Sequence, residues 1–125
     1  MYLLDTHTLV WMNHRPDALP PRVQHIILQG EFSASVVSYW ELTDMCFGLR
    51  APIDNPESWW RRYIDARNIP VLSLEPDHIT AEGRLPQHHR DPVDRLLVAQ
   101  AQVEKLVMLT RDSAVAKYAV RTAWR

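Results

Sequence analysis

Four acidic residues occur where the sequence changes from a short apolar run to a helical pattern. Asp5 ends the first apolar run, and Glu41, Asp94 and Asp112 each fall at the start of an expected helix. In open α/β sheets, ligands bind just outside the carboxyl ends of the strands. We therefore expect the four carboxylates to converge on one rim of the molecule.

Carboxylates packed together without a counter-charge repel one another, which raises their pKa values and destabilises the fold. A divalent cation removes this conflict, and oxygen ligands suit Mg²⁺ or Mn²⁺. A site with few protein ligands leaves coordination positions for water and for phosphate oxygens. The four acids therefore indicate metal-assisted hydrolysis of a phosphodiester by an activated water molecule.

Each acid also has a purely structural explanation. The spacing of Ser38 and Glu41 matches a capping box, which taken alone favours a helix cap for Glu41. The run Asp91-Pro92-Val93-Asp94 fits an N-cap followed by a first helical turn, and Asp112 fits a cap of its own helix. Asp5 has the weakest structural explanation, because it ends a buried strand without an obvious regular helix after it. The joint placement of the acids is what favours a site.

The elements that must position these acids alternate along the chain. We predict short strands over residues 2–4, 32–37, 71–74, 106–109 and, at an edge, 119–124. We predict helices over residues 21–29, 38–49, 56–66, 76–84, 92–105 and 112–118. Parallel strands need crossover connections, which are usually helical. The pattern therefore predicts a three-layer α/β/α sandwich with a mainly parallel sheet of four to five short strands.

Composition limits the class of protein. The chain has 125 residues, 46% of them hydrophobic and 23% charged, which predicts one domain over residues 1–125. A net charge of -1 excludes a basic nucleic-acid coat protein and a polybasic membrane binder. The lone Cys46 excludes an intrachain disulfide, and we expect it in the core. With no signal-peptide pattern and no apolar run near the ~18 residues of a membrane span, we expect a cytoplasmic protein without membrane contact.

Several segments resemble those of PIN-domain proteins, specifically VapC-type toxins of type II toxin–antitoxin systems. They are Leu3-Leu4-Asp5-Thr6-His7, residues 35–42 with Trp40-Glu41-Leu42, residues 89–101 beginning His89-Arg90-Asp91-Pro92-Val93-Asp94, and Leu109-Thr110-Arg111-Asp112. The resemblance covers nearly the whole chain. It implies a single PIN domain that acts as a Mg²⁺- or Mn²⁺-dependent endoribonuclease. Its four-acid catalytic and metal site falls on Asp5, Glu41, Asp94 and Asp112.

The same resemblance implies partners. The substrate would be RNA, with transfer or ribosomal RNA as the expected kinds, and a segment of a cognate antitoxin would mask the active site. A homodimer or a toxin–antitoxin hetero-oligomer is expected. The alternative is a non-catalytic PIN-like module that binds RNA or an antitoxin without cleaving, and the presence of all four acids argues against it.

Five residues near the acids are candidates for supporting roles. Asp91 lies beside the motif and is outside the set of four. The hydroxyls of Thr6 and Thr110 could bind phosphate or water, although local turn hydrogen bonds explain them equally well. Arg95 and Arg111 flank the acids and could neutralise substrate phosphate, or form surface ion pairs.

Two further groups have functional and structural explanations. His88 and His89 lie in a polar loop without regular zinc spacing, so a contact with RNA phosphate competes with a simple surface position. The run Trp59-Trp60-Arg61-Arg62 mixes aromatic and cationic side chains as RNA-binding and partner-binding surfaces do, and it also fits the apolar stripe of a helix. We expect a dimer contact at this run.

Overall fold

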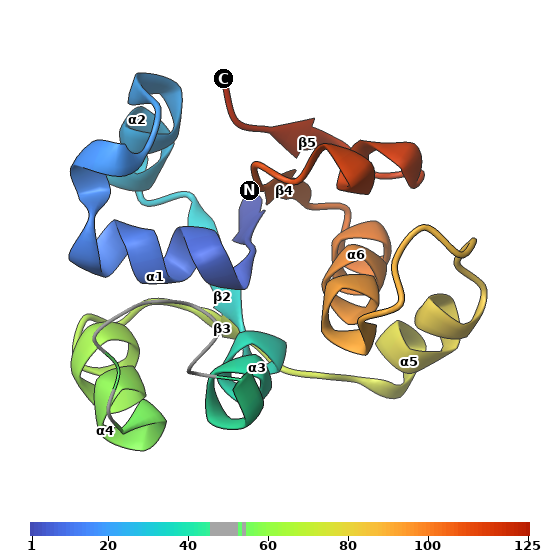
Figure 1. Ribbon diagram of the computed structural model, residues 1–125, viewed down its shortest axis with the longest axis horizontal. Helices are drawn as coiled ribbons and strands as arrows, with labels where there is room; N and C mark the ends of the chain where they lie inside the picture. The colour runs from blue at the N-terminus through green and yellow to red at the C-terminus, as the bar shows by residue number, and fades with distance from the viewer. Residues whose placement is uncertain (46–52, 54) are drawn as a thin grey trace.

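The computed structural model describes residues 1–45, 53 and 55–125 (Figure 1). The predicted core position of Cys46 and the predicted end of a helix at residue 49 lie outside these residues. Among the described residues, no helix is long and apolar enough to cross a bilayer.

Five parallel strands form one sheet in the order β3-β2-β1-β4-β5. They are β1 (Tyr2–Leu4), β2 (Phe32–Ser35), β3 (Val71–Leu72), β4 (Val107–Leu109) and β5 (Thr122–Ala123). All five predicted strands are present, and the edge strands β3 and β5 are shorter than expected. The central place of β1 puts its carboxyl end between those of β2 and β4, where functional side chains would meet.

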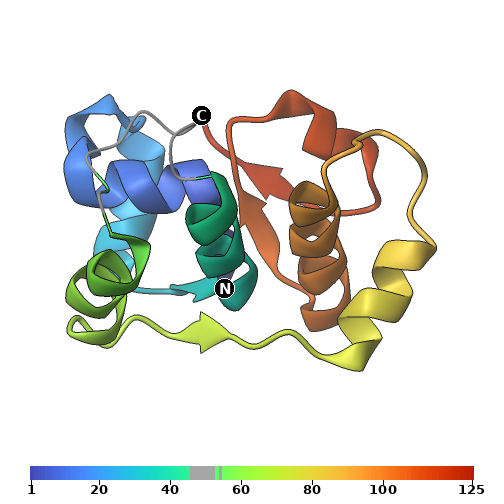
Figure 2. The ribbon, with the colours of Figure 1, turned by 60° about the horizontal axis from the view of Figure 1, so that its bottom comes forward.

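Helices cover both faces of the sheet. They are α1 (Thr6–His14), α2 (Pro21–Gln29), α3 (Val36–Met45), α4 (Pro56–Trp60), α5 (Pro76–Gly83) and α6 (Pro92–Glu104), with the helical turns η1 (Pro16–Ala18), η3 (Arg61–Asp65) and η4 (Ser113–Lys117). Figures 1 and 2 show α1, α2 and α4 on one side of the sheet and α5 and α6 on the other. The predicted three-layer α/β/α sandwich is confirmed.

The core consists of two apolar clusters, one on each face of the sheet. Leu4 and Leu109 belong to the cluster beneath α1, α2 and α4, whereas Leu3 and Met108 belong to the cluster beneath α6. Successive residues of a strand point to opposite faces, so each central strand supplies both clusters. Central strands that are buried on both faces explain why residues 2–4 and 107–109 are continuously apolar.

Two helix starts differ from the sequence prediction. Helix α1 begins directly after Asp5, and its side chain accepts a hydrogen bond from the backbone N–H of Thr8 at 2.9 Å. Helix α3 begins at Val36, two residues before the expected start. There the hydroxyl of Ser35 accepts from the N–H of Val37 at 3.0 Å. Glu41 therefore lies in the second turn of α3 and is not part of a capping box. Asp5 caps a helix although the sequence indicated no helix after it, and Glu41 does not cap the helix that the sequence predicted it to cap.

The segment predicted as one helix over residues 56–66 consists of α4 and the π-helical turn η3. Trp59 and Trp60 are only 5% and 6% exposed. The indole N–H of Trp59 donates to Nε2 of His14 at 2.6 Å, and Trp60 stacks on Tyr39 with ring centroids 5.1 Å apart. Both indoles therefore belong to the core, whereas Arg61 and Arg62 are exposed, and the dimer contact expected at this run stays a prediction.

A buried amide connects β2, α6 and the segment after β3. The Ser35 hydroxyl donates to Oε1 of Gln100 at 2.5 Å, and Nε2 of Gln100 donates to the carbonyl of Ser73 at 3.2 Å. Ser35 and Gln100 are both fully buried. A buried polar group without a partner is costly, so this arrangement requires all three groups to stay together.

We expect Gln100→Leu to lower the free energy of unfolding by about 1–3 kcal/mol, because the buried O–H of Ser35 loses its acceptor and the carbonyl of Ser73 loses its donor. Urea unfolding at neutral pH measures the change. The control Gln87→Leu alters an exposed loop residue and should stay within about 0.5 kcal/mol of the parent chain. Equal stability of Gln100→Leu and the parent would show that the bonds contribute nothing net.

Candidate active site

The carboxylate of Asp5 is held by groups from two strands of the sheet. Leu4 pairs with Leu109, so the residues that follow β1 and β4 are neighbours. The Thr110 hydroxyl donates to Oδ2 of Asp5 at 2.5 Å, while Oδ1 accepts the N–H of Thr8. Each carboxylate oxygen thus receives one donor and retains capacity for a further partner.

Glu41 enters the same rim from α3. It is 7% exposed, and this burial raises its pKa above the ordinary value. A hydrogen bond from Thr6 opposes the shift, whereas the charges of Asp91 and Asp5 add to it. Oγ1 of Thr6 also lies 2.9 Å from Oγ of Ser38. Glu41 is therefore a carboxylate in a dry, partly anionic environment.

Asp94, in the first turn of α6, is the most perturbed acid of the rim. Burial, followed by the charges of Asp91 and Glu41, raises its pKa to about 6, although the charge of His89 opposes the shift. The charge of Asp112 adds a smaller contribution in the same direction. Burial and the like charges of neighbouring carboxylates therefore make ionisation of Asp94 unfavourable in the absence of a cation.

Asp112 begins the turn η4, and its Oδ1 accepts the N–H of Ala114 at 2.9 Å. Its Oδ2 lies 2.9 Å from Nε2 of His89. Burial alone would raise the pKa of Asp112, but the hydrogen bonds from His89 and Ala114 and the charges of His89 and His7 lower it overall. Asp112 therefore stays ionised more readily than Asp94.

His89 pairs with Asp112 of this rim, although its loop position and spacing alone indicated no catalytic role. Besides Asp112, it contacts Tyr118, whose hydroxyl lies 3.0 Å from Nδ1 and whose ring is stacked on the imidazole at 5.5 Å. The available signal was its place two residues before Asp91, inside the PIN-like segment. His88 packs edge-on against the same ring and is exposed.

We call Asp5, Glu41, Asp94 and Asp112 the acidic cluster. Their charges act on one another across the rim, as the pKa shifts of Glu41 and Asp94 show. Within the described residues, no three His, Cys, Asp or Glu side chains lie close enough, as they stand, to hold one metal ion. The donor set itself consists of carboxylate oxygens, which is the chemistry that Mg²⁺ and Mn²⁺ prefer. By donor chemistry the cluster therefore fits a hard divalent cation.

Three of the supporting residues connect the acids to one another or to their helices. Thr110 donates to Asp5 and accepts the N–H of Asp112 at 3.1 Å, so one hydroxyl joins two acids. Thr6 offers a hydrogen bond to Glu41. Asp91 caps α6 by accepting the N–H of Val93 at 2.9 Å, which confirms the predicted cap.

The two arginines have different surroundings. Arg95 is only 6% exposed. Its guanidinium donates to the Glu82 carboxylate at 2.7 Å, and it also reaches the carbonyls of Glu82, Leu85 and Pro86. The predicted contact of Arg95 with substrate phosphate is therefore wrong, because these groups occupy its donors. Arg111 is exposed and lies over the ring of Trp11, 5.2 Å from the centroid.

The sequence matches the family profile of the PIN domain over residues 2–121. The chain belongs to the PIN domain family. This assignment agrees with the parallel sheet and with the acids at the carboxyl ends of its strands. A search of curated proteins finds no match for the sequence.

Solved structures of the same fold align with at least 90% of this chain. VapBC2 from Rickettsia felis, bound to a DNA fragment from its promoter, aligns with a TM-score of 0.69 and 14% identity over 99% of this chain and 98% of that chain. FitAcB from Neisseria gonorrhoeae aligns with a TM-score of 0.58 and 17% identity over 98% and 96%. A toxin–antitoxin complex from Klebsiella pneumoniae aligns with a TM-score of 0.56 and 17% identity over 90% and 88%. At these identities the likeness shows the PIN fold.

Without metal, the raised pKa of Asp94 predicts that the free energy of unfolding falls as the pH rises from 3.8, the ordinary pKa of this carboxyl, to about 6, its pKa in the folded chain. The reason is that the folded state binds the proton more tightly than the unfolded chain does. Asp94→Asn removes the repelled charge. We expect it to raise the free energy of unfolding at pH 8 by about 1–2 kcal/mol, after allowance for solvent screening, with little gain at pH 4.

Urea unfolding in EDTA at the two pH values measures this difference. Asp65→Asn serves as the control, since Asp65 is exposed on η3 and should change stability little at either pH. A gain for Asp94→Asn that is the same at pH 4 and pH 8 would contradict the cost of ionising the buried Asp94 carboxyl as its cause.

Proposed function

We propose that this chain is a metal-dependent endoribonuclease and the toxin of a toxin–antitoxin pair. The observation that supports this most directly is the raised pKa of Asp94 among the other acids of a PIN domain. A fold that keeps mutually repelling carboxylates together gains stability from a bound cation. A helix cap or a core position does not require such an arrangement.

In this proposal Asp5, Glu41, Asp94 and Asp112 hold Mg²⁺ or Mn²⁺. When bound, the cation supplies an activated water molecule and stabilises the departing oxygen of the phosphodiester. Thr110 and the N–H of Thr8 fix the orientation of the Asp5 carboxylate. His89 pairs with Asp112 and fixes the orientation of its carboxylate. The chain's own residues thus orient the carboxylates before the RNA arrives, which lowers the cost of organising the site.

The partners in this proposal are RNA and a cognate antitoxin. The structurally similar Klebsiella pneumoniae protein was solved in a toxin–antitoxin complex, which supports an antitoxin for this chain as well. We expect an antitoxin segment to cover the acidic cluster and to arrest the enzyme in the cytoplasm, in a homodimer or a hetero-oligomer. The resemblance to VapC-type toxins favours transfer or ribosomal RNA as the substrate.

Asp94 and Asp91 provide a matched test of the cleavage function. Asparagine caps a helix almost as well as aspartate, so Asp91→Asn should retain the fold and most of the nuclease activity. Asp94→Asn should retain the fold and lose Mn²⁺-dependent cleavage by at least about 100-fold, because the carboxylate's charge supplies much of the affinity for the cation. Cleavage of total RNA, with circular dichroism as the folding check, measures both.

Two results would contradict these assignments. Equal loss of activity in the two variants would place Asp91 within the metal-holding set. A correctly folded parent chain that binds RNA or antitoxin and cleaves no RNA with Mg²⁺ or Mn²⁺ would favour the alternative function, a non-catalytic binding module.

Metal binding can be tested without any activity measurement. We expect Mg²⁺ at about tenfold its dissociation constant to raise the melting midpoint of the parent chain by roughly 3–6 °C. Asp5→Asn keeps a competent N-cap and should show a clearly smaller shift, while Asp65→Asn should show the full shift. NaCl at matched ionic strength separates binding from screening. An unchanged midpoint for the parent chain would contradict a metal site.

A further inference from the structure

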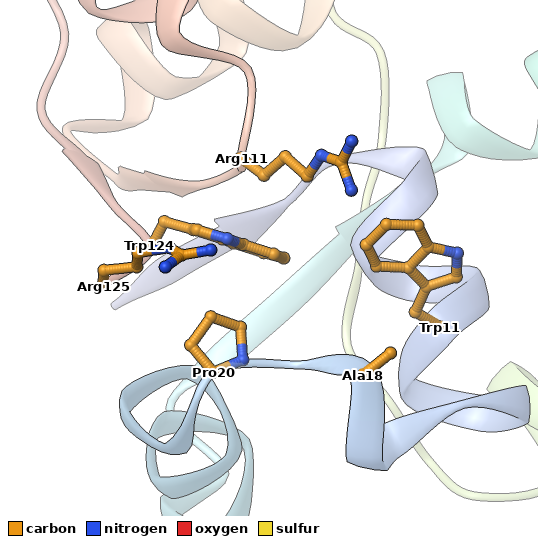
Figure 3. Close-up of a pocket in the computed structure, with 6 residues that line it drawn as sticks. All are labelled: Trp11, Ala18, Pro20, Arg111, Trp124 and Arg125. Atoms are coloured by element: carbon orange, nitrogen blue, oxygen red, sulfur yellow. The ribbon is translucent and has the colours of Figure 1, made fainter.

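A pocket of about 430 Å³ lies beside the acidic cluster, on the side of β5. Its walls come from α1, η1, the start of α2 and the segments after β4 and β5. They are Trp11, Ala18, Pro20, Arg111, Trp124 and Arg125. Figure 3 shows Trp11 and Trp124 on opposite sides, Arg111 at one end, and Ala18 and Pro20 along the floor. We call it the tryptophan–arginine pocket.

The sheet register connects this pocket to the acidic cluster. Leu109 pairs with Ala123, so Arg111 and Trp124 follow neighbouring parallel strands and emerge at the same edge. The N–H of Thr110 donates to the carbonyl of Ala123 at 3.2 Å, and the hydroxyl of Thr110 donates to Asp5. One residue therefore contacts both the strand that leads to Trp124 and an acid of the cluster.

His7 bridges the remaining distance between pocket and cluster. Its ring lies edge-on to Trp11 with centroids 6.4 Å apart, and its charge acts on Glu41 and Asp112. His7 is exposed, as are Arg111 and Arg125. Trp11 of the pocket thus contacts both His7 and Arg111, and Arg111 is adjacent in sequence to Asp112 of the acidic cluster.

The lining favours a ligand that is both aromatic and anionic. Two indoles supply flat apolar surfaces, and within the described part of the chain no ion pair neutralises Arg111 or Arg125. Among the described residues that line the pocket, none carries an acidic side chain. Proteins that bind single-stranded nucleic acid combine such cationic surfaces with aromatic side chains on which bases stack. Duplex RNA hides the faces of its bases in the stack, so it would not fill this pocket.

We propose that the tryptophan–arginine pocket binds one nucleotide of single-stranded RNA adjacent to the phosphodiester at the acidic cluster. The base stacks on Trp124, and the phosphate contacts the guanidinium groups of Arg111 and Arg125. The position of the scissile bond rests on the proposed nuclease function, whereas binding of the nucleotide does not require cleavage.

The test uses the full-length chain with Asp94→Asn as the parent, in EDTA, so that the RNA stays intact. Fluorescence anisotropy of a labelled single-stranded RNA decamer gives the affinity. A series of decamers, each with one abasic nucleotide at a different position, shows whether one base contributes to binding. The added variants are Trp124→Leu, the conservative Trp124→Phe and Arg111→Gln. Arg62→Gln is the charge-matched control, since Arg62 is exposed on η3.

We expect Trp124→Leu and Arg111→Gln each to weaken RNA binding about tenfold, and Trp124→Phe and Arg62→Gln to bind like the parent. Arg111→Gln should also reduce the slope of log affinity against log salt by about 0.7, as loss of one phosphate contact on a single strand predicts. An abasic nucleotide at one position should weaken binding to the parent and leave binding to Trp124→Leu unchanged.

Unchanged affinity in both folded pocket variants, or tight binding of every abasic decamer, would overturn the proposal. The proposal would also be overturned if the pocket variants bound RNA normally and lost only the binding of an acidic aromatic peptide, since the pocket would then be a protein-docking site. Cleavage by the unmodified chain is measured separately with Mn²⁺. Cleavage without pocket-dependent binding overturns the pocket alone, and pocket-dependent binding without cleavage overturns the nuclease function alone.

Discussion

The pairing of β1 with β4, with Leu4 opposite Leu109, is the constraint on which the candidate site depends. It brings Thr110 to Asp5, and the Thr110 hydroxyl then joins Asp5 to the backbone of Asp112. A parallel register that slipped by one residue would turn every side chain of a strand to the opposite face. The two apolar clusters that share these strands oppose such a slip, so core packing and the geometry of the acids are maintained by the same contacts.

The acids are held in place although their charges repel. Asp5, Asp91 and Asp112 each accept a backbone N–H at the start of a helix or helical turn, where the helix dipole favours a negative charge. Glu41 and Asp94 lack such a cap and have the raised pKa values. Capping and a site role are compatible, because each carboxylate oxygen can accept more than one partner and a cap uses only part of that capacity. The helix starts thus offset part of the electrostatic cost of concentrating acids on one rim.

The three residues after β4 connect the acids to their surroundings. Thr110 fixes Asp5, Arg111 lies over Trp11, and Asp112 pairs with His89. A short segment at the carboxyl end of a central strand thus joins the acidic cluster to the tryptophan–arginine pocket. Its backbone is tied to β5 through Ala123, which explains how an edge strand of two residues can position a pocket wall.

The sequence by itself determined the α/β/α class, the parallel sheet, most element positions and the acidic residues of the rim, because strand and helix periodicity and capping residues are local signals. Tertiary structure decided that a helix begins directly after Asp5, that α3 begins two residues earlier than expected, and that the side chain of Arg95 is buried. It also decided the burial of Trp59 and the placement of His89 against Asp112. Each of these depends on partners distant in the sequence, such as Leu109 for Thr8 or Glu82 for Arg95. Burial and hydrogen-bond partners across such separations follow from how the layers pack, and no local pattern of residue types specifies them.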